Sequence, residues 1–389
     1  MTLITDPQEA AAFCARQAEA EFITVDTEFI RDTTYWPRLC LIQIAGPEEA
    51  AAIDPLAEGM DLEPVWSLFD KTDLLKVFHA ARQDLEIFFH DSSRLPHPVF
   101  DTQVAAMVCG FGDQVGYEKL ASRLAGARID KSVRFADWAH RPLGRKQLDY
   151  ALADVTHLRV IYQKLRKKLA NSDRESWLEE EMAVLLNPAT YRLEPSEAWR
   201  RLKSRSRDRR YLAHLRNLAA WREREAQRRN VPRNRILRDE QIYDVAGLAP
   251  QTAEDLARAR GVSTDYARGK VGQAILEAVA EGLAMDEADL PKAPPREQQV
   301  EAGPVVDLLK VLLKQKCEQH GVAQRLLANA ADLEALAAGD PETERNLLQG
   351  WRGEIFGKAA SALLTGRLLL TGDGNGGLQL IDKKENNEP

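Results

Sequence analysis

The sequence predicts an α/β domain built on an open mixed sheet, followed by all-α helical domains. Short apolar runs rich in β-branched residues occur early in the chain, at residues 22–29, 39–45, 50–53, 74–78 and 99–100. Only short turns separate the first three runs, which favours antiparallel neighbours. The later runs alternate with helical patterns, which is typical of a sheet flanked by helices. Strand patterns nearly vanish after residue 170, so the rest of the chain is expected to be helical.

The helical patterns divide the chain into further segments. In the first 170 residues they occur at 80–89 and 102–108, and from there the pattern is helical to about residue 170, ending with 145–169. Beyond the α/β domain, changes in composition and a proline-rich stretch mark the boundaries. We predict an α/β domain over 1–170, a connecting helical segment over 171–208, a basic helical domain over 209–286, a proline-rich linker over 287–304 and a second helical domain over 305–375.

The two helical domains share a faint repeat of apolar positions at an offset of 91 residues. Leu218 aligns with Leu309, for example, and Ile236 aligns with Leu327. One interpretation is an internal duplication, with the second copy divergent. The alternative is a chance agreement between two amphipathic helical segments.

Composition places the chain in a broad class. It has 389 residues, of which 44% are hydrophobic and 29% charged, which is ordinary for a water-soluble protein with packed cores. No apolar run approaches the roughly 18–20 residues that span a bilayer, and MTLITDPQEA lacks the features of a signal peptide. The four cysteines are far apart in the sequence, which favours buried thiols over a disulfide framework. We therefore expect a cytoplasmic protein.

The charge is unevenly distributed along the chain. Residues 199–240 contain 15 Lys or Arg against 5 Asp or Glu, although the whole chain has a net charge of −7. This asymmetry is typical of a segment that faces a polyanion. A solvated helix face with internal ion pairs is an equally good interpretation of composition alone.

Two carboxylates occur at the end of the first predicted strand, in VDTEF. Asp26 and Glu28 are two residues apart, so on a strand they project from the same face. Carboxylates in a buried strand are costly unless a cation or a hydrogen-bond donor satisfies them. The alternative is that the strand ends before them and both are solvated.

Three further polar residues complete a candidate site. Asp84 lies near the start of the helix after the fourth strand, where a helix dipole alone would also favour a carboxylate. Tyr150 and Asp154 are four residues apart and therefore share one helix face, although a packed Tyr beside an exposed Asp is the simpler alternative. Carboxylates that converge from separate elements are what a pair of hard divalent cations requires, and two such ions can assist in-line displacement at phosphorus.

Several motifs are similar to a known family. VDTEF, HAARQD and the Tyr150–Asp154 pair resemble the three exonuclease motifs of the DEDD superfamily, in its tyrosine branch. The histidine branch places a His where this chain has Asp149. Further segments resemble the bacterial ribonuclease D family, namely DTQVAA (101–106), GYEKLA (116–121), KSVRFADWAHRPL (131–143) and QLDYALADV (147–155). The basic stretch that begins at WRRLKSR is similar to the start of an HRDC (helicase and RNase D C-terminal) domain.

The resemblance implies a fold, an activity and residue roles. The fold would be a ribonuclease H-like (DnaQ-like) exonuclease domain followed by HRDC domains. The activity would be 3′–5′ exoribonucleolytic trimming of tRNA precursors and other small structured RNAs, with two Mg²⁺ or Mn²⁺ ions. Asp26, Glu28 and Asp154 would bind the metals, Asp84 would contact the second ion directly or through water, and Tyr150 would hydrogen-bond the attacking water or the scissile phosphate.

RNA contacts are expected outside the carboxylate cluster. Phe29 follows Glu28 directly and is a candidate for stacking on a base. The basic domain supplies candidates for phosphate contacts: Arg222, Arg224, Arg228, Arg229, Arg233 and Arg235. The alternatives are a DNA 3′–5′ exonuclease of the same chemistry and a non-catalytic RNA-binding adaptor.

Two features receive no catalytic role. His79 stands where the family often has a small residue or Asn, and it is interpreted as a core or supporting residue. GDGNGG at 372–377 lacks the lysine of a phosphate-binding loop and the glutamate of a calcium loop. We predict a turn there, between the apolar runs LLL and LQLI.

Overall fold

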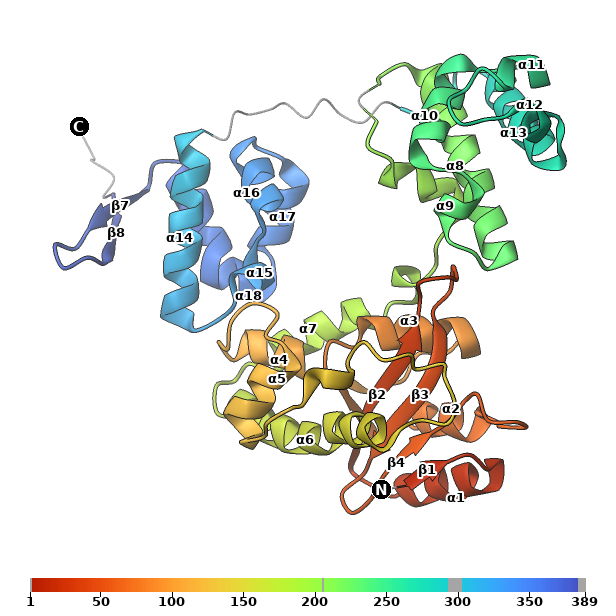
Figure 1. Cartoon of the computed structure of the whole chain (residues 1–389). Helices are drawn as coiled ribbons and strands as arrows, with labels where there is room; N and C mark the ends of the chain where they lie inside the picture. The colour runs from red at the N-terminus through yellow and green to blue at the C-terminus, as the bar shows by residue number, and fades with distance from the viewer. Residues whose placement is uncertain (1, 205, 293–302, 384–389) are drawn as a thin grey trace, which may run out of the picture.

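A mixed sheet forms the centre of the first domain. The computed structural model describes residues 2–204, 206–292 and 303–383. Six strands are arranged in the order β1-β4-β3-β2-β5-β6 (Figure 1). The antiparallel meander of β2, β3 and β4 and the parallel pairing of β5 and β6 confirm the predicted mixed sheet. The strands are β1 (Thr2–Ile4), β2 (Phe22–Ile30), β3 (Arg38–Ala45), β4 (Ala50–Ile53), β5 (Leu75–Phe78) and β6 (Val99–Asp101).

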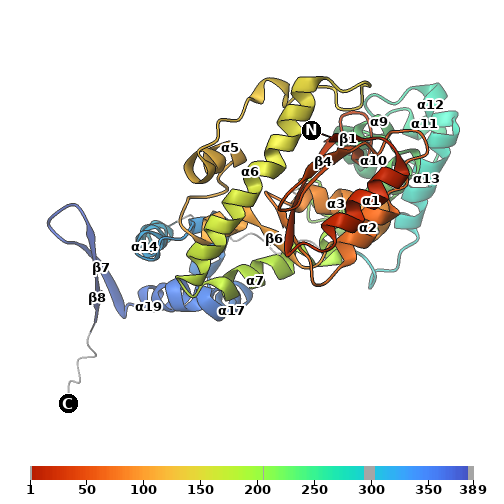
Figure 2. The ribbon, with the colours of Figure 1, turned by 90° about the horizontal axis from the view of Figure 1, so that it is seen from below.

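Helices cover both faces of this sheet. Figure 2 shows the long helix α6 (Arg145–Ala170) on one side and α1 (Pro7–Gln17), α2 (Glu63–Asp70) and α3 (Arg82–Ser92) on the other. Two shorter helices, α4 (Thr102–Val108) and α5 (Tyr117–Leu120), follow β6. Neither β1 nor α1 was expected from the sequence, because the three residues of β1 are too few for a periodic signal.

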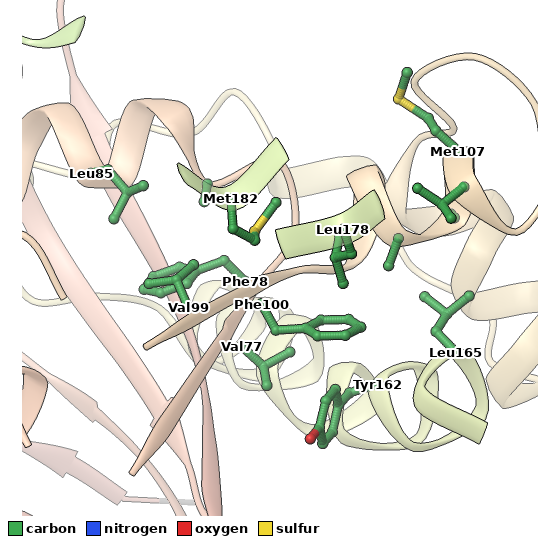
Figure 3. Packing of buried hydrophobic residues seen from close by; sticks show 14 of the residues in the cluster. Val77, Phe78, Leu85, Val99, Phe100, Met107, Tyr162, Leu165, Leu178 and Met182 are labelled. Carbon is green, nitrogen blue, oxygen red and sulfur yellow. The ribbon is translucent and has the colours of Figure 1, made fainter. Parts of the chain in front are cut away.

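The core of this domain joins the sheet to α6 and to α7 (Glu175–Leu185). Figure 3 shows Phe100 of β6 against Tyr162 of α6, with Leu178 and Met182 of α7 close by. The Tyr162 ring centre is 4.9 Å from that of Phe100 and 4.6 Å from that of Phe22. Burial of these large side chains fixes α6 on the sheet, and α6 carries two of the predicted site residues.

The basic domain has a separate core. Its main helices are α8 (Arg209–Arg229), α9 (Arg233–Ile236), α10 (Asp239–Leu248), α11 (Ala253–Leu256), α12 (Thr264–Arg268) and α13 (Lys270–Leu283). The 3₁₀ segment Pro195–Arg201 packs on α8 through Ala198, and Leu202 belongs to the same core. The predicted connecting segment 171–208 is therefore divided, since α7 packs into the first core and residues 195–202 pack into the second.

The second helical domain packs directly on the α/β domain. It consists of α14 (Pro304–His320), α15 (Gln324–Leu327), α16 (Ala330–Ala337), α17 (Pro341–Leu348), α18 (Gly350–Arg352), the π-helical turn Gly353–Gly357 and α19 (Lys358–Leu364). The Ala323 amide donates to the Met107 carbonyl at 3.0 Å. A Cβ at Gly110 would collide with the Gly321 carbonyl, so the close approach of the two backbones requires glycine there. Trp177 and Trp351 stack with ring centres 4.5 Å apart.

The helices of the two domains repeat at the predicted offset. α15 begins 91 residues after α9, and α16 begins 91 residues after α10. The aligned residues Leu218 and Leu309 are both fully buried. The repeat therefore corresponds to equivalent core positions on equivalent helices, which chance agreement between amphipathic segments does not require.

A hairpin follows the second helical domain. β7 (Leu368–Gly372) pairs with β8 (Leu378–Asp382) in antiparallel register, with Gly372 opposite Leu378. This confirms the turn predicted at GDGNGG, and it carries regular structure past the predicted domain end at residue 375.

Three remaining expectations concern the linker, the cysteines and the membrane. Residues 293–302 of the predicted linker lie outside the described residues. All four cysteines are buried free thiols. Across the described ranges, no helix is long and apolar enough to cross a membrane.

Candidate active site

The strand β2 supplies Asp26 and Glu28. Both residues lie inside the strand, with Asp26 opposite Gln43 and Glu28 opposite Leu41 of β3. The pairing register shifts only after Glu28, so regular alternation keeps both side chains on one face. The alternative that the strand ends before these carboxylates is therefore wrong. β2 lies between β3 and β5, which places both carboxylates in the middle of the sheet.

Asp84 is positioned by a turn that an aspartate holds in place. Ala80 adopts a left-handed conformation with φ 61°, which costs about 1–2 kcal/mol for a residue with a Cβ. The Asp101 carboxylate accepts hydrogen bonds from the amides of Ala80 at 3.0 Å and Ala81 at 2.8 Å. These bonds stabilise the turn into α3, whose first turn contains Asp84. The Thr27 hydroxyl of β2 donates to the buried Asp84 carboxylate.

The helix α6 carries Tyr150 and Asp154 on the face toward the sheet. The Thr24 hydroxyl of β2 donates to the Val155 carbonyl at 2.8 Å, which fixes this part of α6 against the catalytic strand. The Tyr117 hydroxyl, from α5, donates to the main-chain carbonyl of Asp154. Asp154 is buried, so the alternative of an exposed Asp beside a packed Tyr is wrong.

A cavity of about 370 Å³ opens over these side chains. Asp26, Tyr150 and Asp154 line it, together with Tyr117, Lys119 and Arg134. Another cavity, of about 550 Å³, lies between α6, α7 and the sheet edge, but it is lined mainly by apolar residues and contains none of the predicted carboxylates. Three of the predicted site residues, Asp26, Tyr150 and Asp154, therefore share the smaller cavity.

Burial raises the pKa values of the four carboxyl groups, and repulsion by neighbouring carboxylates adds to this at Asp26, Glu28 and Asp84. Burial raises the pKa of Asp26 well above its usual range, and the nearby Asp154 raises it further. Burial and the charges of Asp26, Asp154 and Asp84 raise the pKa of Glu28 to about 10. Burial and Asp26 likewise raise the pKa of Asp84. Burial raises the pKa of Asp154 to about 7, although interaction with the Tyr150 hydroxyl partly opposes it. The negative charges therefore destabilise one another unless a cation joins them.

The donor set fits a hard divalent cation. Its oxygen atoms come from carboxylates, which Mg²⁺ and Mn²⁺ prefer. The buried Oδ1 atom of Asp154 has no hydrogen-bond partner, so a ligand position is available on it. Among the described residues, no three His, Cys, Asp or Glu side chains already form a ready metal-ligand set.

Sequence reasoning gave no role to several residues at this site. Tyr117 and Arg134 both line the cavity. They lie in GYEKLA and KSVRFADWAHRPL, two segments whose resemblance to the family implies no role for either residue. Thr27 lies between the two carboxylates of VDTEF and bonds to Asp84. His79, which was assigned no role, packs edge-on against Tyr117 with ring centres 5.4 Å apart. Side-chain hydrogen bonds across elements leave no periodic signal in a sequence.

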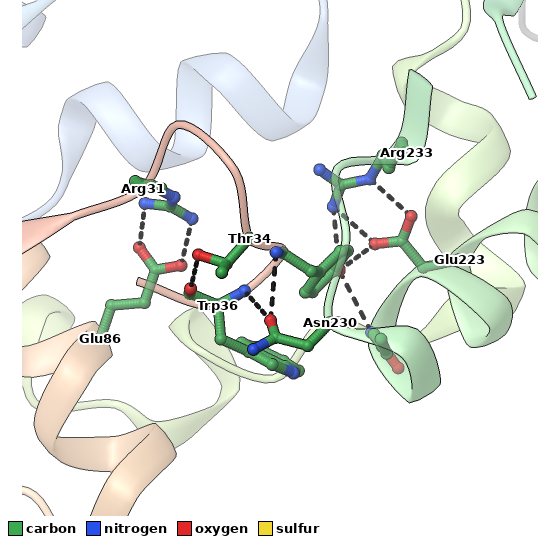
Figure 4. Close-up of polar contacts among 9 residues, drawn as sticks. Arg31, Thr34, Trp36, Glu86, Glu223, Asn230 and Arg233 are labelled. Carbon is green, nitrogen blue, oxygen red and sulfur yellow. Dashed lines mark hydrogen bonds and ion pairs between the residues drawn. The ribbon is translucent and has the colours of Figure 1, made fainter. Parts of the chain in front are cut away.

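The structure corrects part of the predicted RNA-binding set. Arg222 is buried, and its guanidinium donates to the Leu237 carbonyl at 2.9 Å and to Asp239 at 2.6 Å. The prediction that Arg222 contacts RNA is therefore wrong, because the side chain has no access to a phosphate. Arg233 is also committed internally, since it pairs with the buried Glu223 and donates to the Tyr35 hydroxyl at 3.0 Å (Figure 4).

The other predicted contacts remain accessible to different degrees. Arg228 and Arg229 are exposed and pair with Glu225 within α8. Arg224 and Arg235 are exposed, and neither forms an ion pair with the described residues. Phe29 is half-buried and packs against the main core, so only part of its ring is available for stacking.

Comparison with known proteins decides the family. The model of a 3′–5′ exonuclease domain matches residues 1–170, and the HRDC domain model matches residues 212–279. The chain is 53% identical to ribonuclease D of Acidiphilium cryptum over 96% of its length and 95% of the relative's. It is 50% identical to ribonuclease D of Granulibacter bethesdensis, with the same coverage. The chain belongs to the ribonuclease D family.

A solved structure agrees with this assignment. The fold matches the crystal structure of Escherichia coli RNase D, described as an exoribonuclease involved in structured RNA processing, with a TM-score of 0.79. The two chains are 29% identical, and the match covers 94% of this chain and 98% of the other. Ribonucleases D are 3′–5′ exoribonucleases that depend on divalent metal ions, which agrees with the acidic cavity described above.

Proposed function

We propose that this ribonuclease D trims the 3′ ends of tRNA precursors and other small structured RNAs in the cytoplasm and releases nucleoside 5′-monophosphates. The observation that supports the reaction most strongly is the convergence of Asp26, Glu28, Asp84 and Asp154 from three separate elements. Thr27, between Asp26 and Glu28 on β2, donates a hydrogen bond to Asp84. Asp26 and Asp154, from two of these elements, line the same cavity, where the terminal nucleotide would bind.

Two Mg²⁺ or Mn²⁺ ions would be held by this cluster. Asp26, Glu28 and Asp154 are the proposed ligands, and Asp84 would reach the second ion directly or through water. Bound ions would polarise the phosphate and lower the pKa of the attacking water. The same ions would offset the repulsion between the carboxylates and the substrate phosphate, which otherwise opposes RNA entry.

The protein side chains would orient the reactants. The Tyr150 phenol lines the cavity next to Asp154, and burial raises its pKa, so it stays protonated at neutral pH. A protonated phenol can donate one hydrogen bond and accept another. It is therefore suited to hold the attacking water or a phosphate oxygen in line with the bond that breaks. The Tyr117 hydroxyl donates to the main-chain carbonyl of Asp154, so Tyr117 is proposed as a positioning residue.

The basic helical domain would supply a largely sequence-independent grip on RNA. The exposed arginines of α8 and α9 are the residues of that domain left for phosphate contacts after Arg222 and Arg233 are excluded. Phosphate contacts make binding salt-dependent without specifying a base sequence. The second helical domain, proposed as a divergent HRDC copy, contacts the α/β domain through the hydrogen bond from the Ala323 amide to the Met107 carbonyl.

A time course on a 5′-labelled RNA hairpin with a single-stranded 3′ tail tests the proposal. The reactions contain Mg²⁺, Mn²⁺ or EDTA, and a matched set contains Asp26→Ala. The expected result is a ladder that shortens from the 3′ end, absent with EDTA and in the variant. Asp26→Ala should still bind the RNA nearly as well as the parent protein does, because the basic domain is unchanged.

Other outcomes would identify a different function. Degradation of the matching DNA strand but not the RNA would indicate a DNA exonuclease. Full-length RNA that persists in both metals, while it still binds the protein, would indicate an adaptor. Comparison of a tRNA precursor with an unrelated hairpin of equal tail length then tests the substrate class, because a tRNA-specific enzyme should differ in kcat/KM between them.

A further inference from the structure

A large aromatic side chain is exposed near the mouth of the acidic cavity. Phe135 is 92% exposed, which is the highest exposed fraction among the large hydrophobic side chains in the described part of the chain. The guanidinium carbon of its neighbour Arg134 lies 5.4 Å from the Phe135 ring centre, and Arg134 also lines the cavity. A phenylalanine side chain in contact with water lacks the favourable free energy that burial would provide, so its exposure does not stabilise the fold. A function that uses the exposed ring would explain its presence.

The segment that carries Phe135 is firmly attached to the domain. Trp138 is 3% exposed and packs into a small core with Cys40 and Leu152. Arg141 forms a bidentate ion pair with the buried Asp54, at 2.6 and 2.7 Å, and also donates to the Cys40 carbonyl at 2.7 Å. Because this fixed attachment is three residues from Phe135, the segment loses less conformational entropy when a ligand contacts the ring.

The charges around the cavity are arranged for a phosphodiester strand. The proposed metal ligands Asp26 and Asp154 lie in its wall, and Glu118 is a further acidic residue of the lining. Lys119 of α5 and Arg134, from the segment after residue 131, provide positive charge. Both cations are therefore available to a phosphate that enters this cavity. Arg134 lies between the acidic cluster and the exposed ring, since its charge acts on Glu28 and its guanidinium contacts Phe135.

We propose that Phe135 and Arg134 form the entry subsite for the single-stranded 3′ segment of RNA. Phe135 stacks on a base upstream of the terminal nucleotide, and Arg134 binds the phosphate between that base and the cavity. This inference rests on the proposed function, because it assigns the path that the substrate takes to the carboxylate cluster. Aromatic stacking accepts any base, so the subsite holds the strand in register without selecting its sequence.

A double-mutant cycle between the protein and the RNA tests the stacking. The two proteins compared, with Phe135 and with Phe135→Ala, both carry Asp26→Asn to prevent cleavage. The RNA hairpins have 3′ tails in which one nucleotide at a time is replaced by an abasic residue. Phe135→Ala should raise the Kd of the intact tail by roughly 5- to 150-fold. That loss should disappear at one internal abasic position and persist at the others, because a base that is absent cannot stack.

Conservative variants separate stacking from a structural role. Phe135→Tyr should restore binding, whereas Phe135→Leu, which is apolar but not aromatic, should not. Val184→Ala, at an exposed apolar side chain on α7, is the matched control and should leave the Kd unchanged. Arg134→Ala should reduce the slope of log Kd against log salt by about 0.7, the value for one phosphate contact on a single strand. Arg16→Ala, at an exposed arginine on α1, should not reduce it.

Two results would overturn the subsite. One is a Kd for the intact tail that Phe135→Ala leaves unchanged, which would mean that the exposed ring does not contact the RNA. The other is an equal loss at all abasic positions, which would mean that the substitution disturbs the domain. Failure of the proposed function looks different, because the parent protein would then leave RNA uncleaved in both metals while the binding cycle could still show coupling.

Discussion

The Arg233 guanidinium lies 4.7 Å from the centre of the Tyr35 ring. Arg233 belongs to the basic domain, and Tyr35 lies in the loop that joins β2, the strand of Asp26 and Glu28, to β3. The buried Glu223 accepts from both side chains, and Asn230 accepts from the amides of Tyr35 at 3.1 Å and Trp36 at 3.0 Å (Figure 4). The basic domain is therefore docked on the loop next to the catalytic strand.

Docking of the basic domain should depend on pH through Glu223. Burial alone would raise the pKa of Glu223, but the hydrogen bonds from Arg233 and Tyr35 lower it below its ordinary value of 4.5. A carboxyl group with a lowered pKa in the folded state stabilises that state above its ordinary pKa. This contribution should be lost as the pH falls below 4.5 and through the folded pKa.

Glu223→Gln provides the measurement. At pH 7 it should lower the free energy of unfolding of the basic domain by about 1.5–3 kcal/mol, the contribution of hydrogen bonds to a charged group. The difference between the parent and the variant should stay constant from pH 7 to about 5 and shrink below that. Denaturant titrations at several pH values test this, and a difference that grows on acidification would contradict the assignment.

The arginines of the basic domain should separate into two groups. Arg224→Ala with Arg235→Ala should weaken RNA binding and lower its salt dependence without loss of stability, because both side chains are exposed. Arg222→Ala should instead destabilise the domain, since it leaves the Leu237 carbonyl without its donor. Filter binding and thermal unfolding measured on the same samples distinguish the groups. A stable Arg222→Ala protein with weakened RNA binding would restore Arg222 to the RNA surface.

Tyr150 and Tyr117 should respond differently to loss of the hydroxyl. Tyr150→Phe should lower kcat by about 10²- to 10⁴-fold with a smaller effect on KM, as expected for a group that acts on the reacting atoms. Tyr117→Phe removes a hydrogen bond to the backbone of α6 and should cost only about 1 kcal/mol of stability. Steady-state kinetics on the tailed hairpin test both, and equal losses in kcat would mean that both phenols contact the substrate.

The acidic cluster should make the metal-free protein less stable than a neutralised variant. Asp154→Asn removes one of the mutually repelling charges and should raise the Tm measured in EDTA. In the parent protein, Mn²⁺ at about 100 times its Kd should add about 2.7 kcal/mol of stability. The variant should show a much smaller gain. An equal Mn²⁺-dependent shift in both proteins would place the ion elsewhere.

The sequence allowed the catalytic set to be proposed because each part of it has a local signature. Asp26 and Glu28 are two residues apart and share one strand face, and Tyr150 and Asp154 share one helix face. The order of these residues along the chain matches a specific combination of family motifs. The mixed sheet was predictable for a similar reason, since apolar periodicity reports which face of each element is buried. β1 was not, because three residues carry too little pattern.

The roles of individual polar side chains were decided by tertiary structure. Composition made Arg222 and Arg235 equivalent, yet one is buried against Leu237 and the other faces solvent. Phe135 looked like any other apolar residue until its exposure was known. The sequence by itself determined the longer strands of the sheet and the same-face pairs Asp26–Glu28 and Tyr150–Asp154, because both depend on local spacing. Only the tertiary structure decided which charges pair and which remain exposed, because a hydrogen bond or an ion pair between distant elements depends on where the chain brings the partner.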